Sequence, residues 1–364
     1  MVSETGIDVK SAAAAVYFMK AISLLILYYD INPKLMKTIG LFFGGLSNEH
    51  DVSVVSAGNV VRNFDYRKYK LALIYWRKQD GCFYLVKDIK KLKPADNRRI
   101  GLEDFSSLFD AALLMTHGKY GEDGILQSLL ESKKIKYCGC RVLSSALCMD
   151  KAAFKTLMAA NNIRKTRYGV LDYQAYSPAE NDRELKKLKD VLKFPLYIKP
   201  ANSGSSIGIT RVAKASGLGV AVRAALKHDN KIVIEEGLNG PKEIEIAVLG
   251  NKKLTVSRPG ELRLAKDFYD YDDKYKKGEA QAVIPAKISP AQTKEARQMA
   301  ERIYRLAGCQ GFARVDLFLD HGRFYINEIN TLPGFTDISM FPMLMMDAGL
   351  SYKRLLNEII NLAQ

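Results

Sequence analysis

The stretch 39-IGLFFGG-45 decides the fold class of this chain. A short apolar run ended by paired glycines is typical of a buried strand followed by a tight turn. A helix-compatible stretch comes next, in which Val52, Val55 and Val60 are expected to face inward. Further apolar runs predict buried strands at 71-LALIYW-76 and 111-AALLMT-116. Strand, glycine turn, helix and strand in this order predict a parallel α/β sheet, in a domain that closes near residue 140.

The rest of the chain predicts a mixed arrangement. An amphipathic helix is expected at 146–160 and another helix over 213–228, with strands at 196-LYIKP-200 and 231-KIVIEE-236. The period of two in 243-EIEIAVLG-250 favours a half-buried antiparallel strand. A helix at 290–307 and the hairpin 312-FARVDLFLDHGRFYINEIN-330 complete the pattern. We therefore predict the α/β class, with α+β character in the C-terminal part.

The bulk composition is that of a globular protein. A length of 364 residues suits two or three domains, and 48% hydrophobic with 26% charged residues excludes disordered and membrane-spanning classes. The formal net charge of +15 raises a nucleic-acid-binding alternative. However, the basic residues are spread over segments such as 87–99 and 183–193, and no nucleic-acid-binding signature accompanies them. A basic protein also suits an anionic small molecule, which it attracts over long range.

The first 35 residues do not fit the α/β pattern. The unbroken apolar run 21-AISLLILYY-29 is too short to span a bilayer, and no signal-peptidase-like site follows Tyr29. We expect residues 1–35 to be an atypical hydrophobic extension that takes no part in the chemistry. The five cysteines lack metal-ligand spacing, so we expect reduced thiols in a cytoplasmic protein.

Polar side chains interrupt the hairpin near its end. Arg314 and Asp316 share one face of the first strand, and Glu328 and Asn330 share one face of the second. A three-residue turn at 320–322, with opposed residues summing to 642, would put all four on one side, and a slip of one residue would separate them. Two carboxylates and an amide oxygen suit Mg²⁺. The alternative is that the acids only pair with Arg314, but the Pro-Gly turn that follows exposes backbone N–H groups and favours a site.

A second candidate feature is the loop 201-ANSGSSIGIT-210, which follows Lys199 at a strand end. Small residues let the backbone approach phosphates closely, although the loop lacks the spacing of a P-loop and is weak evidence alone. Together with the hairpin it favours a phosphate site. Glu235 and Glu236 end another strand, where they are either on a solvated edge or positioned to receive adenine or ribose groups.

Two further loops follow strands of the parallel sheet, 117-HGKYGEDG-124 and 44-GGLSNEHDVS-53. Ligands bind α/β proteins at the carboxyl ends of parallel strands. His117 is either a satisfied core histidine or a ligand-binding residue. Glu49 and Ser53 follow the first strand in the same way as His117 follows its strand. We expect both loops to lie at one edge of the sheet and to form one site.

Seven motifs, in this order, resemble those of D-alanine–D-alanine ligases of the ATP-grasp superfamily. They are 44-GGLSNEHDVS-53, 117-HGKYGEDG-124, 149-MDK-151, 199-KPANSGSSIG-208, 268-FYDYDDKY-275, 313-ARVD-316 and 327-NEINTLPGFT-336. The resemblance covers residues 36–364 and implies an ATP-grasp fold preceded by a Rossmann-like parallel-sheet N-terminal domain. The domains it implies are 36–140 for substrate, 141–230 with the phosphate loop, and 231–364 with a lid loop and the metal hairpin.

The resemblance implies an ADP-forming ligase that joins two D-alanines through an acyl phosphate, for peptidoglycan precursor synthesis in the cytoplasm. ATP would be the co-substrate, with two Mg²⁺ or Mn²⁺ ions, no nucleic-acid or membrane partner, and a homodimer by analogy. Tyr275 favours D-alanine over D-lactate as second substrate. The alternatives are a D-alanine–D-lactate ligase, another ATP-grasp carboxylate–amine ligase and, more remotely, a nucleic-acid-binding protein.

The resemblance also implies nucleotide and metal positions. Lys151 and Lys199 resemble lysines that contact ATP phosphates. The metal ligands would be Asp316, Glu328 and Asn330. Further nucleotide-binding positions are Ser206, Glu235, Glu236, Leu238, Glu243 and Lys274. One residue is inserted before Glu243 relative to the usual spacing, so the hinge acid that meets adenine is either Glu235 or Glu236.

The substrate positions complete the resemblance. Glu49 resembles the acid that receives the first substrate's ammonium group, linked through Ser205 to Tyr275 on a lid at 266–280. Arg314 and the backbone N–H of Gly334 match the groups that hold the developing oxyanion. The other substrate-binding positions are His117, Ser339 and Met340, of which the last two border the second substrate's carboxylate.

Overall fold

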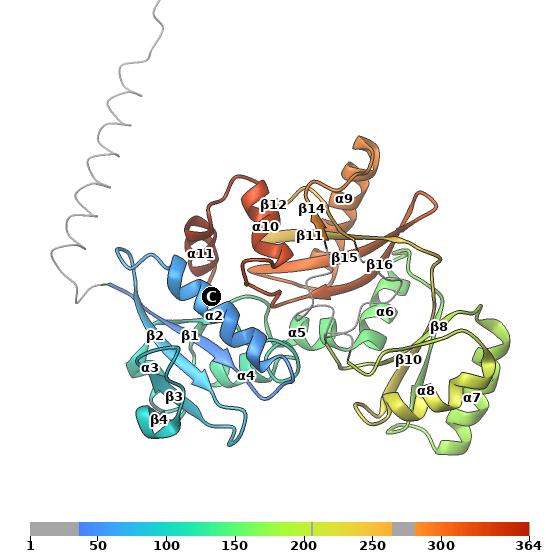
Figure 1. Ribbon diagram of the computed structural model, residues 1–364, viewed down its shortest axis with the longest axis horizontal. Helices are drawn as coiled ribbons and strands as arrows, with labels where there is room; N and C mark the ends of the chain where they lie inside the picture. The colour runs from blue at the N-terminus through green and yellow to red at the C-terminus, as the bar shows by residue number, and fades with distance from the viewer. Residues whose placement is uncertain (1–35, 205–206, 264–280, 364) are drawn as a thin grey trace, which may run out of the picture.

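The structure is a computed structural model that describes residues 36–204, 207–263 and 281–363, and these residues form three β-sheets with helices packed on them (Figure 1). The expected extension at 1–35 and the whole expected lid at 266–280 lie outside the described residues. So do four predicted site residues, Ser205, Ser206, Lys274 and Tyr275.

The first sheet has the order β4-β3-β2-β1-β5-β6. Its strands are β1 (Thr38–Gly44), β2 (Lys70–Trp76), β3 (Phe83–Val86), β4 (Arg98–Ile100), β5 (Ala111–Leu114) and β6 (Lys136–Cys138). Strand β1 pairs in parallel with β2 and β5, and β5 pairs in parallel with β6, whereas β3 and β4 add an antiparallel edge. The predicted parallel α/β sheet is confirmed. The helical elements of this part are α2 (His50–Asn63), η1 (Pro94–Asp96), α3 (Phe105–Leu108) and α4 (Ile125–Ser132).

Helix α2 departs from the prediction at one position. Val52 and Val60 are buried, but Val55 is 56% exposed, so its prediction as an inward residue was wrong. The buried face of α2 is filled by small residues instead, Ser53, Ser56 and Ala57. Small side chains let the helix lie close to the sheet, and the two serines form hydrogen bonds with backbone groups outside the helix.

The second sheet is antiparallel, with the order β7-β10-β8-β9. Its strands are β7 (Tyr168–Asp172), β8 (Leu196–Pro200), β9 (Thr210–Val212) and β10 (Lys231–Glu236), and the adjacent helical elements are α7 (Pro178–Val191), η2 (Ala215–Gly217) and α8 (Leu218–Ala225). The helix predicted at 146–160 is in fact two helices, α5 (Val142–Met149) and α6 (Lys151–Ala160). The break falls at Asp150, whose carboxylate accepts the N–H groups of Ala152 and Ala153 and so begins a new helix.

The third sheet has the order β14-β13-β11-β15-β16, with β12 also paired to β11. Its strands are β11 (Lys242–Gly250), β12 (Leu254–Val256), β13 (Gly260–Arg263), β14 (Gln281–Val283), β15 (Phe312–Asp320) and β16 (Arg323–Asn330). Helix α9 (Pro290–Leu306) packs on one face through Ala296, Ala300 and Ile303, which leaves the other face for polar groups. The predicted antiparallel pairing of the strand at 243–250 is confirmed, but its prediction as half-buried was wrong, because residues 244–250 are buried on both faces of the sheet.

The hairpin register differs from the predicted one. The turn has two residues, His321 and Gly322, both at positive φ, and the pairs next to it sum to 643. A bulge beyond Asp316 then shifts the pairing, so that Asp316 lies opposite Glu328 and Arg314 opposite Asn330. The predicted sum of 642 and three-residue turn were wrong, but the four polar residues still share one face because the bulge supplies the missing residue.

The last helices of the chain pack against the first sheet. Helices α10 (Met340–Asp347) and α11 (Tyr352–Asn361) contribute Phe341, Leu344 and Leu355 to the same apolar core as Val60 of α2. Figure 1 shows α11 beside α2. The N-terminal part is therefore joined to residues from the end of the chain, and the predicted division at residues 140 and 230 stays a prediction.

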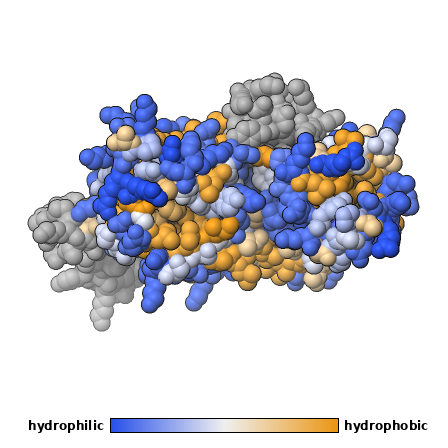
Figure 2. Space-filling model, turned by 90° about the horizontal axis from the view of Figure 1, so that it is seen from below, coloured by the Kyte–Doolittle hydropathy of each residue, from blue (hydrophilic) through white to orange (hydrophobic). Residues whose placement is uncertain are grey.

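Among the residues that the structure describes, no helix combines the length and the apolar character needed to cross a membrane. The face shown in Figure 2 carries hydrophobic patches separated by hydrophilic residues. Such alternation is ordinary for a protein surface, of which apolar atoms make up a large share.

Candidate functional site

A row of carboxylates crosses three neighbouring strands. Glu245 of β11 lies opposite Asp316 of β15, which lies opposite Glu328 of β16. Directly opposed residues point to the same side of a sheet, so these acids share one face with Arg314 and Asn330. The sequence predicted Asp316, Glu328 and Asn330 together, and the structure brings them together. Glu245 was not predicted from the sequence, although the period of two that indicates strand β11 puts this acid on the same face as Glu243.

Arg314 is held firmly inside this row. Its Nε and Nη2 donate to the two oxygens of Asp316 at 2.7 and 2.6 Å, and its Nε lies 2.9 Å from Glu245 Oε2. Flanking carboxylates raise the pKa of the buried guanidinium well above its usual value. The pairing of Asp316 with Arg314, left open by the sequence, is present. It fixes the direction of the guanidinium fork.

The donor set on this face fits a hard divalent cation. Asp316 and Glu328 are 13% and 30% exposed at the side chain, so the face is open to a ligand, and the Asn330 amide donates to Asp316 Oδ2 at 2.8 Å. Within the described ranges, no three His, Cys, Asp or Glu side chains are grouped at metal-binding distances. The set instead combines carboxylate oxygens with an amide oxygen, a chemistry that Mg²⁺ accepts. The metal assignment therefore remains a proposal.

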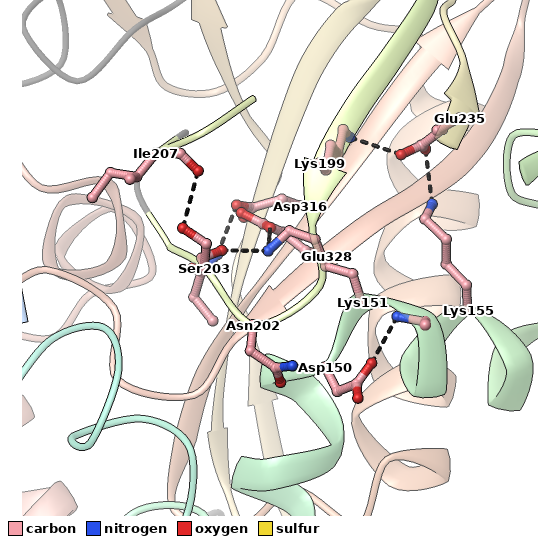
Figure 3. A network of polar contacts seen from close by, with 12 residues as sticks. Asp150, Lys151, Lys155, Lys199, Asn202, Ser203, Ile207, Glu235, Asp316 and Glu328 are labelled. Carbon is pink, nitrogen blue, oxygen red and sulfur yellow. Dashed lines mark hydrogen bonds and ion pairs between the residues drawn. The ribbon is translucent and has the colours of Figure 1, made fainter. Parts of the chain in front are cut away.

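Two lysines approach this face from the second part of the chain (Figure 3). Lys151, at the start of α6, donates from Nζ to the backbone oxygen of Ser203 at 2.6 Å and lies 3.7 Å from Glu328 Oε2. Lys199, on β8, lies 2.7 Å from Glu235 Oε2. The loop after Lys199 and the acid row are thus adjacent. Glycine and serine backbone, two ammonium groups and hard oxygen donors converge in one place.

The two acids that end β10 have different surroundings. Glu235 is buried, and its carboxylate binds Lys155 as well as Lys199, so it is not on a solvated edge. These cations hold the pKa of Glu235 well below its ordinary value, against the effect of burial. Glu236 accepts from Lys193 N at 2.9 Å and lies 3.2 Å from Arg167. Because the carboxylate of Glu235 is bound by Lys155 and Lys199, any contact of this residue with adenine would be made by its backbone.

The two predicted loops of the first sheet meet at one edge, as expected. Ser47 donates to the backbone oxygen of His117 at 2.6 Å. Glu49 Oε2 lies so close to Gly118 and Gly204 that a Cβ added to either glycine would come within 2.1 and 2.8 Å of it. Gly118 also has φ +72°, which favours glycine. Glu49 therefore sits between the first sheet and the Gly/Ser loop.

His117 is buried with both ring nitrogens engaged. Nδ1 lies 2.9 Å from the backbone oxygen of Leu332, and Nε2 lies 2.9 Å from Ser56 Oγ. Burial lowers the pKa of His117 to about 4, so the ring is neutral at neutral pH. A neutral ring must carry its proton on Nδ1 to donate to the carbonyl, and Nε2 then accepts from Ser56. This favours a positioning role for His117, and its direct binding of substrate stays a prediction.

The loop around Gly334 is fixed at the following residue. Phe335 N donates to Ser56 Oγ at 3.2 Å, and Phe335 O accepts from Asn59 at 3.1 Å and from the Tyr352 hydroxyl at 2.6 Å. Helix α2 and helix α11 thus hold both backbone groups of Phe335. Sequence reasoning missed Ser56 and Asn59, because their partner lies about 280 residues away in the chain.

The predicted second-substrate residues lie beside Gly334. A Cβ on Gly334 would come within 2.8 Å of Ser339 Oγ, which accepts from Thr336 N at 3.0 Å. Met340 is buried, and its side chain packs toward Gly260. A contact of Met340 with substrate would therefore come from its backbone. Leu238 lies in the turn from β10 to β11, and Glu243 lies at the start of β11; both are part-buried.

Glu122 is a further acid that the sequence did not single out. Its carboxylate accepts from Gly118 N at 3.0 Å, and its backbone oxygen accepts from Thr331. Burial, followed by the nearby charge of Glu49, raises the pKa of Glu122 to about 8. Glu122 therefore links the first-sheet loop to the segment after the hairpin, in a form that is mostly protonated at neutral pH.

The chain is similar to known proteins over most of its length. Residues 38–140 match the family model described as D-ala D-ala ligase N-terminus, and residues 157–361 match the model described as D-ala D-ala ligase C-terminus. A D-alanine--D-alanine ligase of Caldicellulosiruptor bescii is 38% identical over 350 residues, covering 89% of this chain and 94% of that relative. D-alanine--D-alanine ligase B of Clostridium tetani is 38% identical over 352 residues, covering 94% and 97%.

Solved structures give the same result. The VanG D-Ala:D-Ser ligase from Enterococcus faecalis superposes with a TM-score of 0.81 at 33% identity, covering 90% of this chain and 99% of that one. The D-alanine-D-alanine ligase from Coxiella burnetii superposes with a TM-score of 0.76 at 29% identity, covering 90% and 93%. The similarity therefore extends through all three sheets.

Proposed function

The chain belongs to the D-alanine–D-alanine ligase family, whose members are ADP-forming, ATP-dependent ligases, and we propose that it joins two D-alanine molecules to D-alanyl-D-alanine for peptidoglycan precursors. The observation that carries the proposal is the convergence of three groups. Lys151 lies beside Glu328 of the acid row, Lys199 stands at the start of the Gly/Ser loop beside Glu235, and Glu49 lies beside the same loop. Such a site brings phosphate-binding cations next to an acid that suits an amino group.

The first step activates a carboxylate. A free carboxylate is a poor acceptor for an amine, so the first D-alanine attacks the γ-phosphate of ATP through its carboxylate oxygen, forming an acyl phosphate and releasing ADP. We propose that Glu49 receives the ammonium group of this D-alanine. Lys151 and Lys199 would neutralise charge on the phosphates. Divalent ions held by Asp316, Glu328 and Asn330 would add positive charge at the phosphates.

The second step forms the peptide bond. The amine of the second D-alanine attacks the acyl carbonyl, a tetrahedral oxyanion develops, and inorganic phosphate leaves. We assign Arg314 and the Gly334 N–H to this oxyanion. The support is preorganisation: Arg314 is fixed by Asp316 and Glu245, and the Gly334 loop is fixed through Phe335. Donors that are already oriented cost little reorganisation when the charge appears.

Water must be kept from the acyl phosphate, which hydrolyses readily. We propose that residues 266–280, with Tyr275 and Lys274, act as a closing lid. Ser205 and Ser206 would complete the phosphate loop. A cytoplasmic location agrees with all five cysteines of the described part being unpaired, and a homodimer is proposed by analogy with the family.

The second substrate is the specificity question, because the solved relatives include a D-Ala:D-Ser ligase as well as D-alanine–D-alanine ligases. The deciding experiment measures phosphate release from ATP with D-alanine alone, with L-alanine alone, and with D-alanine combined with D-serine or D-lactate, and identifies products by mass spectrometry. We expect D-alanyl-D-alanine as the main product and no reaction with L-alanine alone. Preferred formation of D-alanyl-D-serine or of the D-lactate ester would overturn the substrate assignment and leave the ligase chemistry intact.

A further inference from the structure

We propose that Lys155 is a positioning residue for nucleotide binding: its ammonium group holds the carboxylate of Glu235 and thereby leaves Lys199 free to engage the phosphates. This inference rests on the proposed function, in which Lys199 contacts ATP. Neither the resemblance nor the motif 149-MDK-151 assigned Lys155 a role. It lies one helical turn beyond Lys151 on α6.

The geometry is that of one carboxylate shared by two lysines (Figure 3). Lys155 Nζ donates to Glu235 Oε1 at 2.8 Å, and Lys199 Nζ lies 2.7 Å from Glu235 Oε2. The Thr166 hydroxyl also donates to Oε1. Each carboxylate oxygen thus has its own ammonium partner, and the two lysines do not compete for one oxygen.

Burial separates the tasks of the two lysines. The side chain of Lys155 is 2% exposed and that of Glu235 is 3% exposed, whereas Lys199 is 12% exposed. Lys155 points from α6 toward the sheet and has no open path to a bound nucleotide. Lys199 stands on β8 at the start of the Gly/Ser loop and lies on the same sheet face as Glu235, because it pairs with Val233 two residues away. Of the two lysines bound to Glu235, Lys199 is therefore the one next to the phosphate loop.

The net charge of Lys155, Glu235 and Lys199 explains the role of Lys155. With both lysines charged, the group Lys155–Glu235–Lys199 carries one net positive charge, which is available to an anionic ligand. Attraction to Glu235 opposes the desolvation that lowers the pKa of Lys155, while the two lysines keep Glu235 ionised. Without Lys155, Glu235 and Lys199 would form a closed, neutral pair. A phosphate would then have to draw Lys199 away from a buried carboxylate left without a partner, which is unfavourable.

The test compares Lys155→Met, Glu235→Gln and the double variant. Methionine and glutamine keep nearly the volume of the original side chains while removing the charges. ATP binding is measured by calorimetry in the absence of D-alanine, and the KM for ATP and kcat are measured by phosphate release. Lys165→Met is the matched control, since Lys165 lies 5.2 Å from the Tyr168 ring that Lys155 also approaches at 5.8 Å.

We expect Lys155→Met to weaken ATP binding and raise the KM for ATP by about tenfold or more, with kcat within threefold of wild type and Lys165→Met close to wild type. Adding Glu235→Gln should restore the KM to within threefold, because it removes the carboxylate that would hold Lys199. An unchanged KM in Lys155→Met, or a double variant as weak as the single one, would overturn the proposal. If Lys155→Met does not fold, the double variant decides: a KM raised tenfold contradicts the positioning role.

Failure of this inference is separable from failure of the proposed function. Wild-type protein that releases phosphate with D-alanine supports the ligase assignment whatever the Lys155 variants do. Conversely, calorimetric ATP binding reports on Lys155 even if the amino-acid substrate proves to be another one.

Discussion

Replacing Ser56 with alanine should slow the reaction without weakening ATP binding. Ser56 is not one of the residues assigned to bind a substrate. Its hydroxyl accepts from Phe335 N at 3.2 Å and lies 2.9 Å from His117 Nε2. Phe335 directly follows Gly334, to which we assign the oxyanion. The substitution therefore tests whether the loop must be held from helix α2.

The magnitude follows from the hydrogen bond that is lost. A buried N–H without an acceptor costs about 1–3 kcal/mol, and the loop can recover part of this by moving toward another partner. Such a movement displaces the neighbouring Gly334 N–H. If the full amount appeared in the barrier, kcat would fall roughly 5- to 150-fold, which reaches only the lower end of the ~100- to 1000-fold that follows complete removal of an oxyanion donor.

Ser53→Ala is the matched control. Ser53 lies on the same buried face of α2, accepts from Gly44 N at 2.7 Å and donates to Met115 O at 2.6 Å. It ties the helix to the first sheet, not to the Gly334 loop, so its loss should lower the free energy of unfolding by a similar ~1–3 kcal/mol. The assay is phosphate release at saturating ATP and D-alanine, with urea unfolding of both variants. Equal kcat values in the two variants would refute the positioning of Gly334 through Ser56.

Other predictions concern single side chains. Glu328→Gln should abolish ATP turnover with the fold retained by circular dichroism, and phosphate release at the wild-type rate would exclude its metal role. Tyr275→Phe should keep ligase activity but make more D-lactate ester at low pH, so an unchanged ester-to-amide ratio would contradict its assignment. The pKa of His117 is about 4 in the folded protein against an ordinary value of 6.5 in the unfolded chain. Its contribution to the free energy of unfolding, up to about 3 kcal/mol, is therefore present above pH 6.5 and lost as the pH falls toward 4. His117→Asn should flatten this pH dependence in urea unfolding. Glu122, with a pKa raised to about 8, should destabilise the fold as pH rises from 4.5 to 8, so Glu122→Gln should be more stable than wild type at pH 9.

Local sequence patterns were sufficient to predict most helices and strands and the separate parts of the site. Apolar runs and glycines located β1, β2 and β5, and the period of two located β11, because alternation and burial leave a direct trace in the sequence. The acids of the hairpin were recognised because polar residues at the end of an apolar run are unusual. These are statements about neighbours in the chain.

Contacts between distant segments were not accessible in this way. Lys155 looks like any lysine on an amphipathic helix until Glu235, 80 residues away, is placed beside it. Ser56 resembles a small residue of a helix face, and its role depends on Phe335, 279 residues away. Both are buried polar residues whose partners lie on segments far away in the chain, and propensity or periodicity carries no information about such partners.

The hairpin lies between these two cases. Its register was predicted wrongly, although the sequence contains the information needed to predict it. Phe324 and Ile326 are two apart, but the next core residue is Ile329, three further on. If the pairing next to the turn continued without a bulge, Glu328 would lie opposite the buried Val315, and Ile329 would lie opposite Arg314. A carboxylate in that core would lack a partner, at a cost of several kcal/mol, and an isoleucine would face the ligand side. The bulge at this point avoids both, and it aligns Glu328 with Asp316. The change from a spacing of two to a spacing of three thus identifies the bulge and, with it, the face on which the acids meet.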